Sequence, residues 1–188
     1  MIRPITWLFL AAILLSTQVI SAELSVPIHR SLEAYEEETK VDQLLLLIQK
    51  RLAIMHEVAR TKWNQDLAIE DKEREQQILT SLIKQSKDSG LDEIWLSQFF
   101  QAQMEAAKEV QKTDFAIWQK QNVQEFPSVL TLAQLRTYID EMNREIIDLL
   151  SKISDPSHTS FILDRPISIR SSDQIESSVW DTAISPLK

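Results

Sequence analysis

The sequence contains a single glycine, Gly90, among its 188 residues, and this scarcity is the strongest constraint on its fold. Residues that favour helices, namely Ala, Leu, Gln, Glu and Lys, are abundant instead. The chain is 44% hydrophobic and 26% charged, and its length suits one well-buried domain better than two. We therefore expect a single all-α domain and argue against an all-β fold.

Four segments have the apolar periodicity of amphipathic helices, in which hydrophobic residues recur every three or four positions. They cover residues 41–63, 71–90, 92–119 and 131–150. Asp71 is a suitable N-cap for the second segment, which we expect to end at the glycine, and a T-x-x-Q capping box opens the fourth. The pattern predicts about four main helices around a buried site.

Residues 1–22 differ from this domain and have the layout of a secretory signal peptide. One cation, Arg3, precedes an apolar run over residues 7–15, and Ser-Ala stands directly before residue 23. The run is short for a bilayer-spanning helix, which needs about 20 apolar residues. We therefore expect cleavage after Ala22, export to the periplasm or the medium, and no membrane attachment afterwards; an uncleaved anchor is the alternative.

The mature chain is expected to have three parts. A polar, acidic lead-in over residues 23–40 precedes the helical domain at residues 41–155. Residues 156–188 are rich in serine and contain Pro166 and Pro186, and their structure is not assigned from the sequence.

Composition also narrows the function. Without Arg3 the chain has 19 basic and 28 acidic residues, a balance that disfavours binding to nucleic acid. It has no cysteine, and its three histidines, His29, His56 and His158, have no partner four residues away, so we predict no metal site. One glycine cannot build a phosphate-binding loop, and no nucleotide cofactor is expected.

Several polar residues fall on helix faces that otherwise look like core. Arg51 and Lys62 align with the apolar stripe of the first helix, and Gln111 does so on the third. Arg74 and Arg136 align with apolar residues of the second and fourth helices. Each alone could be a snorkelling edge residue or a paired core charge. Together, several cations and one neutral amide suit a small dianion held between helices.

Three stretches carry a resemblance to a known family. RLAIMHEVARTKW at residues 51–63, IEDKERE at residues 69–75 and FFQAQMEAAKEVQ at residues 99–111 resemble the all-helical chorismate mutases, specifically their exported subclass. The resemblance covers about residues 41–150. It implies conversion of chorismate to prephenate by a Claisen rearrangement, which needs no nucleophile, general base or cofactor. The implied mechanism is binding of the reactive conformer and stabilisation of charge on the ether oxygen.

The resemblance also implies roles for individual residues. Arg51 would bind a substrate carboxylate, Lys62 would donate to the ether oxygen and a carboxylate, and Gln111 would donate to the same oxygen from the other side. An arginine grips a carboxylate through a bidentate fork, while ammonium and amide groups supply donors where negative charge grows.

The remaining site residues follow from the same resemblance. Asp71 and Glu75 would take the ring hydroxyl, although an N-cap and a solvated first-turn acid are equally good interpretations of them. Arg74 would lie near the substrate, and Arg136 would stand for an arginine that the exported subclass supplies from a later helix. Ala107 replaces a hydroxyl-bearing residue, which leaves one carboxylate contact in question.

Two other interpretations stay open at this point. The chain could be an exported, non-catalytic helical adaptor, in which case Arg51 and Lys62 would face solvent or a protein partner. It could also bind a different small dicarboxylate without turnover. Exported members of the family are typically homodimers, so the resemblance implies a homodimer, with a monomeric bundle as the alternative.

Overall fold

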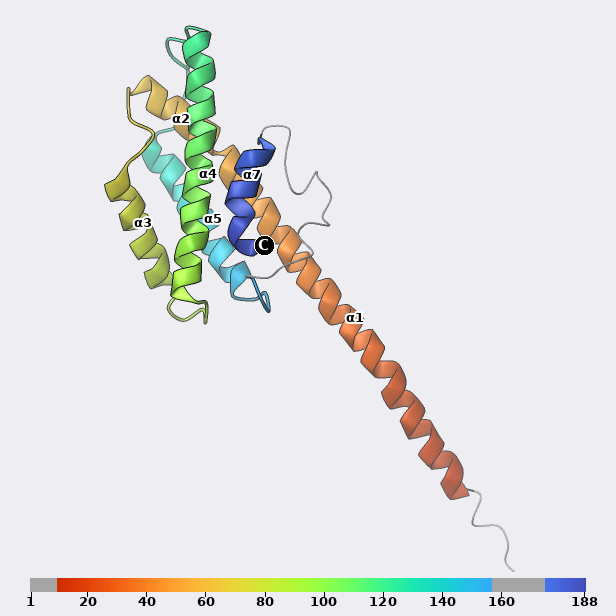
Figure 1. The fold of residues 1–188 in the computed structure, drawn as a ribbon. Helices are drawn as coiled ribbons and strands as arrows, with labels where there is room; N and C mark the ends of the chain where they lie inside the picture. The colour runs from red at the N-terminus through yellow and green to blue at the C-terminus, as the bar shows by residue number, and fades with distance from the viewer. Residues whose placement is uncertain (1–9, 157–174) are drawn as a thin grey trace, which may run out of the picture. The chain divides into compact units, whose positions relative to one another are not determined.

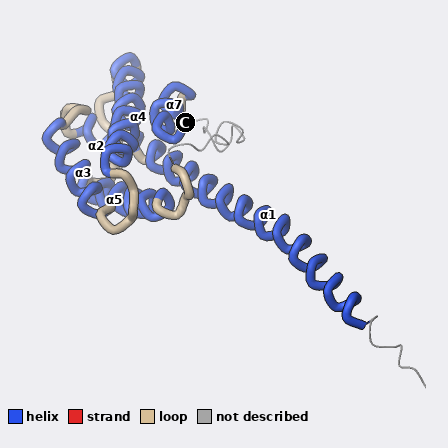
Figure 2. Tube along the Cα trace, turned by 60° about the horizontal axis from the view of Figure 1, so that its bottom comes forward, coloured by secondary structure: helices blue, strands red, loops and turns tan. Residues whose placement is uncertain are grey.

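The computed structural model describes residues 10–156 and 175–188, and within them it contains helices and no strand (Figures 1 and 2). The prediction of an all-α fold is therefore confirmed. The elements are α1 (Leu10–Ala53), α2 (Met55–Asn64), α3 (Lys72–Gln85), α4 (Glu93–Lys120), α5 (Leu132–Leu150), α7 (Ser177–Ile184) and the 3-10 helix η2 (Ser185–Leu187).

The chain divides into two compact units, residues 1–39 and residues 40–188. The described part of the first unit is helical throughout and belongs to α1. No helix in the described part of the chain combines the length and the apolar character needed to span a bilayer. The predicted signal peptide lies partly outside the described residues, as does much of the unassigned C-terminal segment.

The first predicted helix is interrupted, which corrects the expectation of one helix over residues 41–63. The α-helical pattern breaks at Ile54, between α1 and α2. Backbone hydrogen bonds bridge the break, because Ile54 N donates to Lys50 O at 3.1 Å and Val58 N donates to Ile54 O at 3.1 Å. The chain therefore passes from α1 into α2 without a loop.

The core of the second unit forms where the apolar stripes of its helices meet. Helix α4 contacts α2, α3 and α7, and α2 also contacts α5 (Figure 1). Removing these side chains from water is the main favourable contribution to folding. The fully buried large side chains are Leu44, Leu45, Ile48, Leu52, Leu96, Phe99, Phe100, Leu135, Ile146, Leu150 and Ile184.

Local signals place the helix ends. Oδ1 of Asp71 accepts from the backbone N–H of Arg74 at 3.0 Å, which confirms the predicted N-cap of α3. The capping box of Thr131 and Gln134 at the start of α5 is confirmed as well. Gly90 has the expected left-handed conformation, with φ of +75°, but α3 ends at Gln85, so the glycine does not terminate the helix directly.

The end of the chain packs on α4. Helix α7 buries Val179, Trp180, Ala183 and Ile184. Nε2 of the buried Gln103 on α4 donates to the carbonyl oxygen of Ala183 at 2.8 Å. Part of the segment that the sequence left unassigned is therefore a helix of the core.

Candidate active site

A cavity of about 430 Å³ lies among α1, α2, α3, α4 and α5. Apolar side chains from these helices form much of its wall, including Met55, Val58, Ile78 and Met104. The structure brings together all the residues that the sequence predicts for the site. Lining the cavity are Arg51, Lys62, Asp71, Arg74, Glu75, Ala107, Gln111 and Arg136.

Arg51 occupies the last turn of α1 and is buried, with 4% of its surface exposed. Its Nε donates to Oδ1 of Asn143 on α5 at 3.0 Å, and its Nη1 donates to the backbone oxygen of Gln103 at 3.1 Å. Burial lowers the pKa of Arg51 to about 10. The guanidinium therefore remains a cation at neutral pH, held by two neutral oxygens.

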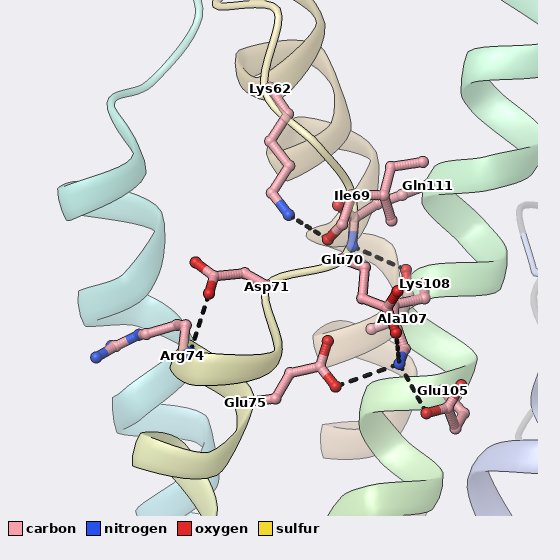
Figure 3. A network of polar contacts seen from close by, with 10 residues as sticks. All are labelled: Lys62, Ile69, Glu70, Asp71, Arg74, Glu75, Glu105, Ala107, Lys108 and Gln111. Carbon is pink, nitrogen blue, oxygen red and sulfur yellow. Dashed lines mark hydrogen bonds and ion pairs between the residues drawn. The ribbon is translucent and has the colours of Figure 1, made fainter.

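Lys62 lies near the end of α2 and is partly buried. Its Nζ donates to the backbone oxygen of Ile69 at 2.6 Å (Figure 3). Burial lowers the pKa of Lys62, the nearby Asp71 and Glu75 raise it, and the positive charge of Arg136 lowers it further. The net result is a pKa below the ordinary value of a lysine.

Gln111 is buried on α4, one turn beyond Ala107. Its Nε2 donates to the backbone oxygen of Ala107 at 3.0 Å, which uses one of two amide N–H groups. Its Oε1 is buried and has no hydrogen-bond partner. An unsatisfied buried polar atom costs about 1–3 kcal/mol, and a group that donates a hydrogen bond to Oε1 would relieve this cost.

The N-cap and the first residues of α3 contribute three of the charged side chains that line the cavity (Figure 3). The carboxylate of Asp71 caps the helix through the backbone of Arg74. The side chain of Arg74 extends away from Glu75 in Figure 3, and its Nε is buried without a hydrogen-bond partner. Glu75 turns towards α4, where its Oε2 accepts from Lys108 at 3.2 Å.

Lys108 also lines the cavity, and the sequence analysis did not select it. Its Nζ lies 3.2 Å from Glu75, 2.7 Å from Glu105 and 3.9 Å from Glu70. Burial alone would lower the pKa of Lys108, but hydrogen bonds and charge from Glu105 and Glu75 raise it. The signal that could have found it is helical spacing, because it lies three residues before Gln111 on α4.

Five cationic and four acidic side chains line the cavity, although the whole protein is acidic. The acids not named in the sequence analysis are Glu70 and Asp140. Three carboxylates surround Lys108, whereas no ion pair to Arg51 occurs in the described residues. The site therefore offers uncompensated positive charge to an anion. Within residues 10–156 and 175–188, no group of three or more His, Cys, Asp or Glu side chains could hold a metal ion.

Residues 40–112 match the family model described as chorismate mutase type II. A protein named secreted chorismate mutase from Mycolicibacterium smegmatis is 28% identical over 103 residues, which cover 55% of this chain and 57% of that protein. A second one with this name, from Mycobacterium tuberculosis, is 26% identical over 142 residues, or 73% of this chain and 71% of that protein. The chain thus spans somewhat more than half of the first relative.

Solved structures share the fold. The chorismate mutase of Burkholderia thailandensis has a TM-score of 0.67 and 24% identity, over 80% of this chain and 99% of that one. The secreted chorismate mutase of Yersinia pestis has a TM-score of 0.64 and 24% identity, over 77% of this chain and 94% of that one. The chain is therefore similar to two proteins named secreted chorismate mutase and shares the fold of solved chorismate mutases, and the match to the family model covers residues 40–112.

Proposed function

We propose that the chain is a chorismate mutase, an isomerase that converts chorismate to prephenate by a Claisen rearrangement. The observation that carries the proposal is the convergence of Arg51, Lys62 and Gln111, from three different helices, on one cavity. The family match over residues 40–112 and the two related proteins support the same activity.

The reaction breaks one C–O bond and forms one C–C bond within the same molecule. Catalysis then depends on holding the conformer in which the reacting carbons face each other. Arg51 is suited to grip one substrate carboxylate, because packing and two hydrogen bonds fix its guanidinium. Arg74 and Arg136, from α3 and α5, supply positive charge for the second carboxylate.

Lys62 and Gln111 act on the ether oxygen, where negative charge grows as the C–O bond breaks. The ammonium of Lys62 has two further N–H groups besides the one bound to Ile69. Gln111 has a second amide N–H besides the one bound to Ala107. By analogy with the donors of oxyanion holes, a fixed donor at such a position lowers the activation barrier by about 3 kcal/mol.

Glu75 and Asp71 are the groups for the ring hydroxyl in this proposal. Glu75 is an acceptor whose carboxylate is oriented by Lys108, while Asp71 contributes through its backbone because its side chain caps α3. Ala107 lines the cavity but offers no hydroxyl to a substrate carboxylate. The resemblance implies a hydroxyl at this position in other members of the family, and its contact with a substrate carboxylate is therefore absent here.

The adaptor interpretation receives no support from the site. It requires Arg51 and Lys62 to face solvent or a protein partner, whereas Arg51 is buried and Lys62 is partly buried at the same cavity.

We also propose that the protein is exported, with cleavage after Ala22, to the periplasm or the medium, and that it forms a homodimer. The related proteins are named secreted chorismate mutases, which supports export. Mass spectrometry of the protein recovered outside the cytoplasm tests the cleavage site, and light scattering on the mature chain tests the dimer.

The decisive experiment follows the loss of chorismate absorbance with the purified mature chain. Arg51→Ala and Lys62→Ala should each lower kcat/KM by at least about 100-fold. Lys50→Ala is the matched control, because Lys50 is an exposed cation next to Arg51, and it should retain the parent rate. Full activity in either site variant would remove the assignment, and binding of chorismate without turnover would indicate a dicarboxylate-binding protein.

A further inference from the structure

Asn143 is a buried amide on α5, with 1% of its surface exposed. Its Oδ1 accepts a hydrogen bond from Nε of Arg51 at 3.0 Å, across 92 positions of sequence. It is not among the residues that line the cavity. Asn143 therefore reaches the cavity through the side chain of Arg51 rather than by lining it.

The second group that holds Arg51 is also neutral. Nη1 donates to the backbone oxygen of Gln103 at 3.1 Å. Burial is the cause of the lowered pKa of Arg51, with no neighbouring carboxylate to oppose it. Lys108 has the opposite surroundings, because Glu75, Glu105 and Glu70 lie within 4 Å of its ammonium.

The difference between an amide and a carboxylate at this position has a clear physical consequence. A carboxylate hydrogen-bonded to Nε would form a buried ion pair and neutralise the guanidinium before any ligand arrived. An amide oxygen fixes the same geometry and leaves the full positive charge in place. The unliganded protein then contains a buried charge that is not compensated, and a ligand carboxylate relieves that cost when it binds.

We propose that Asn143 is a positioning residue that orients Arg51 for the ligand while preserving its charge. The inference rests on the proposed role of Arg51 as the group that binds a substrate carboxylate. It deepens that role by naming what makes Arg51 selective for an anion, namely a pair of neutral acceptors in place of an acid.

The test is the substitution Asn143→Asp, which keeps a hydrogen-bond acceptor of nearly the same shape and adds a negative charge. We expect KM for chorismate to rise by about 10-fold or more, because a charge-assisted bond to the substrate is lost, while kcat changes little. The thermal unfolding midpoint should stay the same or rise, because the buried charge is now paired. A purely structural acceptor role predicts the parent KM in this variant.

Two further variants separate the proposal from other effects. Asn143→Leu removes the acceptor without adding charge, and it should lower both the thermal midpoint and kcat/KM. Thr80→Asp adds the same charge at an exposed position of α3, and its KM should match that of the parent. A similar rise of KM in Thr80→Asp would show a general charge effect and overturn the proposal.

Binding of prephenate by calorimetry keeps the inference distinct from the proposed activity. If the parent protein fails to convert chorismate but binds prephenate, the proposed activity is wrong, and weaker binding by Asn143→Asp still supports the role of Asn143. If the parent turns chorismate over and Asn143→Asp has the parent values of KM and prephenate affinity, the positioning role is wrong and the proposed activity stands.

Discussion

Nζ of Lys62 lies 2.6 Å from the backbone oxygen of Ile69, so the ammonium is bound to the connection that leads from α2 into α3 (Figure 3). The same connection approaches Lys108 on α4, because Oε1 of Glu70 lies 3.9 Å from its Nζ. Two cations of the cavity, Lys62 and Lys108, therefore contact the segment that precedes Asp71. Both lysines should influence ligand binding, but they should lose their protons over different pH ranges, because the pKa of Lys62 is lowered and the pKa of Lys108 is raised.

The activity should fall at alkaline pH because of Lys62. Burial lowers its pKa below the ordinary value of 10.5, so the ammonium loses its proton, and with it the positive charge, earlier than an exposed lysine would. We expect kcat/KM to decline with a midpoint below 10.5. Lys62→Arg should shift the decline to higher pH, because a guanidinium keeps its proton to higher pH than an ammonium in the same surroundings. A profile from pH 6 to 11 checks this, and an identical alkaline limb in both proteins would contradict it.

Gln111→Glu should restrict the activity mainly to acidic pH. A carboxylate cannot donate a hydrogen bond to the ether oxygen, and it would face the backbone oxygen of Ala107 that now accepts from Nε2. Activity should therefore survive where the new acid is protonated. The matched control is Gln119→Glu at an exposed position of α4. If both variants keep the parent pH profile, Gln111 does not serve as a donor.

Lys108→Met should destabilise the protein and weaken substrate binding together. The pKa of Lys108 is raised in the folded state, so its ion pairs stabilise the fold at neutral pH and lose that effect as pH rises through the raised pKa. Loss of the pairs should cost about 1 kcal/mol of unfolding free energy. KM should also rise, because Glu75 loses the group that orients it. Denaturant unfolding and kinetics test both, with Lys112→Met at an exposed position of α4 as control.

Ala107→Ser should strengthen binding of chorismate. Ala107 is buried at the cavity wall and offers no polar group. A hydroxyl there adds one hydrogen-bond donor for a substrate carboxylate, worth about 1 kcal/mol, or roughly fivefold in KM. The increase should appear in KM with kcat nearly constant. Ala106→Ser, at the neighbouring core position, is the control, and an equal effect of both changes would rule out a direct contact.

The sequence predicted the helices well where amphipathic periodicity and caps agreed. Asp71 and the pair of Thr131 and Gln134 are local signals, and each marks the start of a helix in the structure. The break at Ile54 has no such signal in the sequence, because no capping side chain marks the start of α2. The backbone angles of Ile54 also remain helical, with φ of −66° and ψ of −14°. Helix α7 was not predicted because it has only eight residues within a serine-rich segment, and its apolar residues gain their burial from contact with α4.

The candidate site shows the same division. Arg51, Lys62 and Gln111 stood out because each is polar on an apolar stripe, a pattern visible within one helix. Lys108 has the helical spacing from Gln111 that could have found it, but neither Lys108 nor Asn143 was selected, because their importance comes from partners on other helices, such as Glu75 on α3 and Arg51 on α1. Periodicity locates a residue on a face of its helix but does not identify which side chain a neighbouring helix presents to it.

Gln103 connects the end of the chain to the site. Its amide nitrogen is bonded to Ala183 of α7, while its backbone oxygen receives Nη1 of Arg51. Helix α7 thus supports the residue that holds the guanidinium of Arg51, although α7 lies outside the family match over residues 40–112. A deletion or proteolytic cut that removed α7 would take away this hydrogen bond together with the core contacts of Trp180 and Ile184, so it should lower both the stability of the protein and its affinity for the substrate.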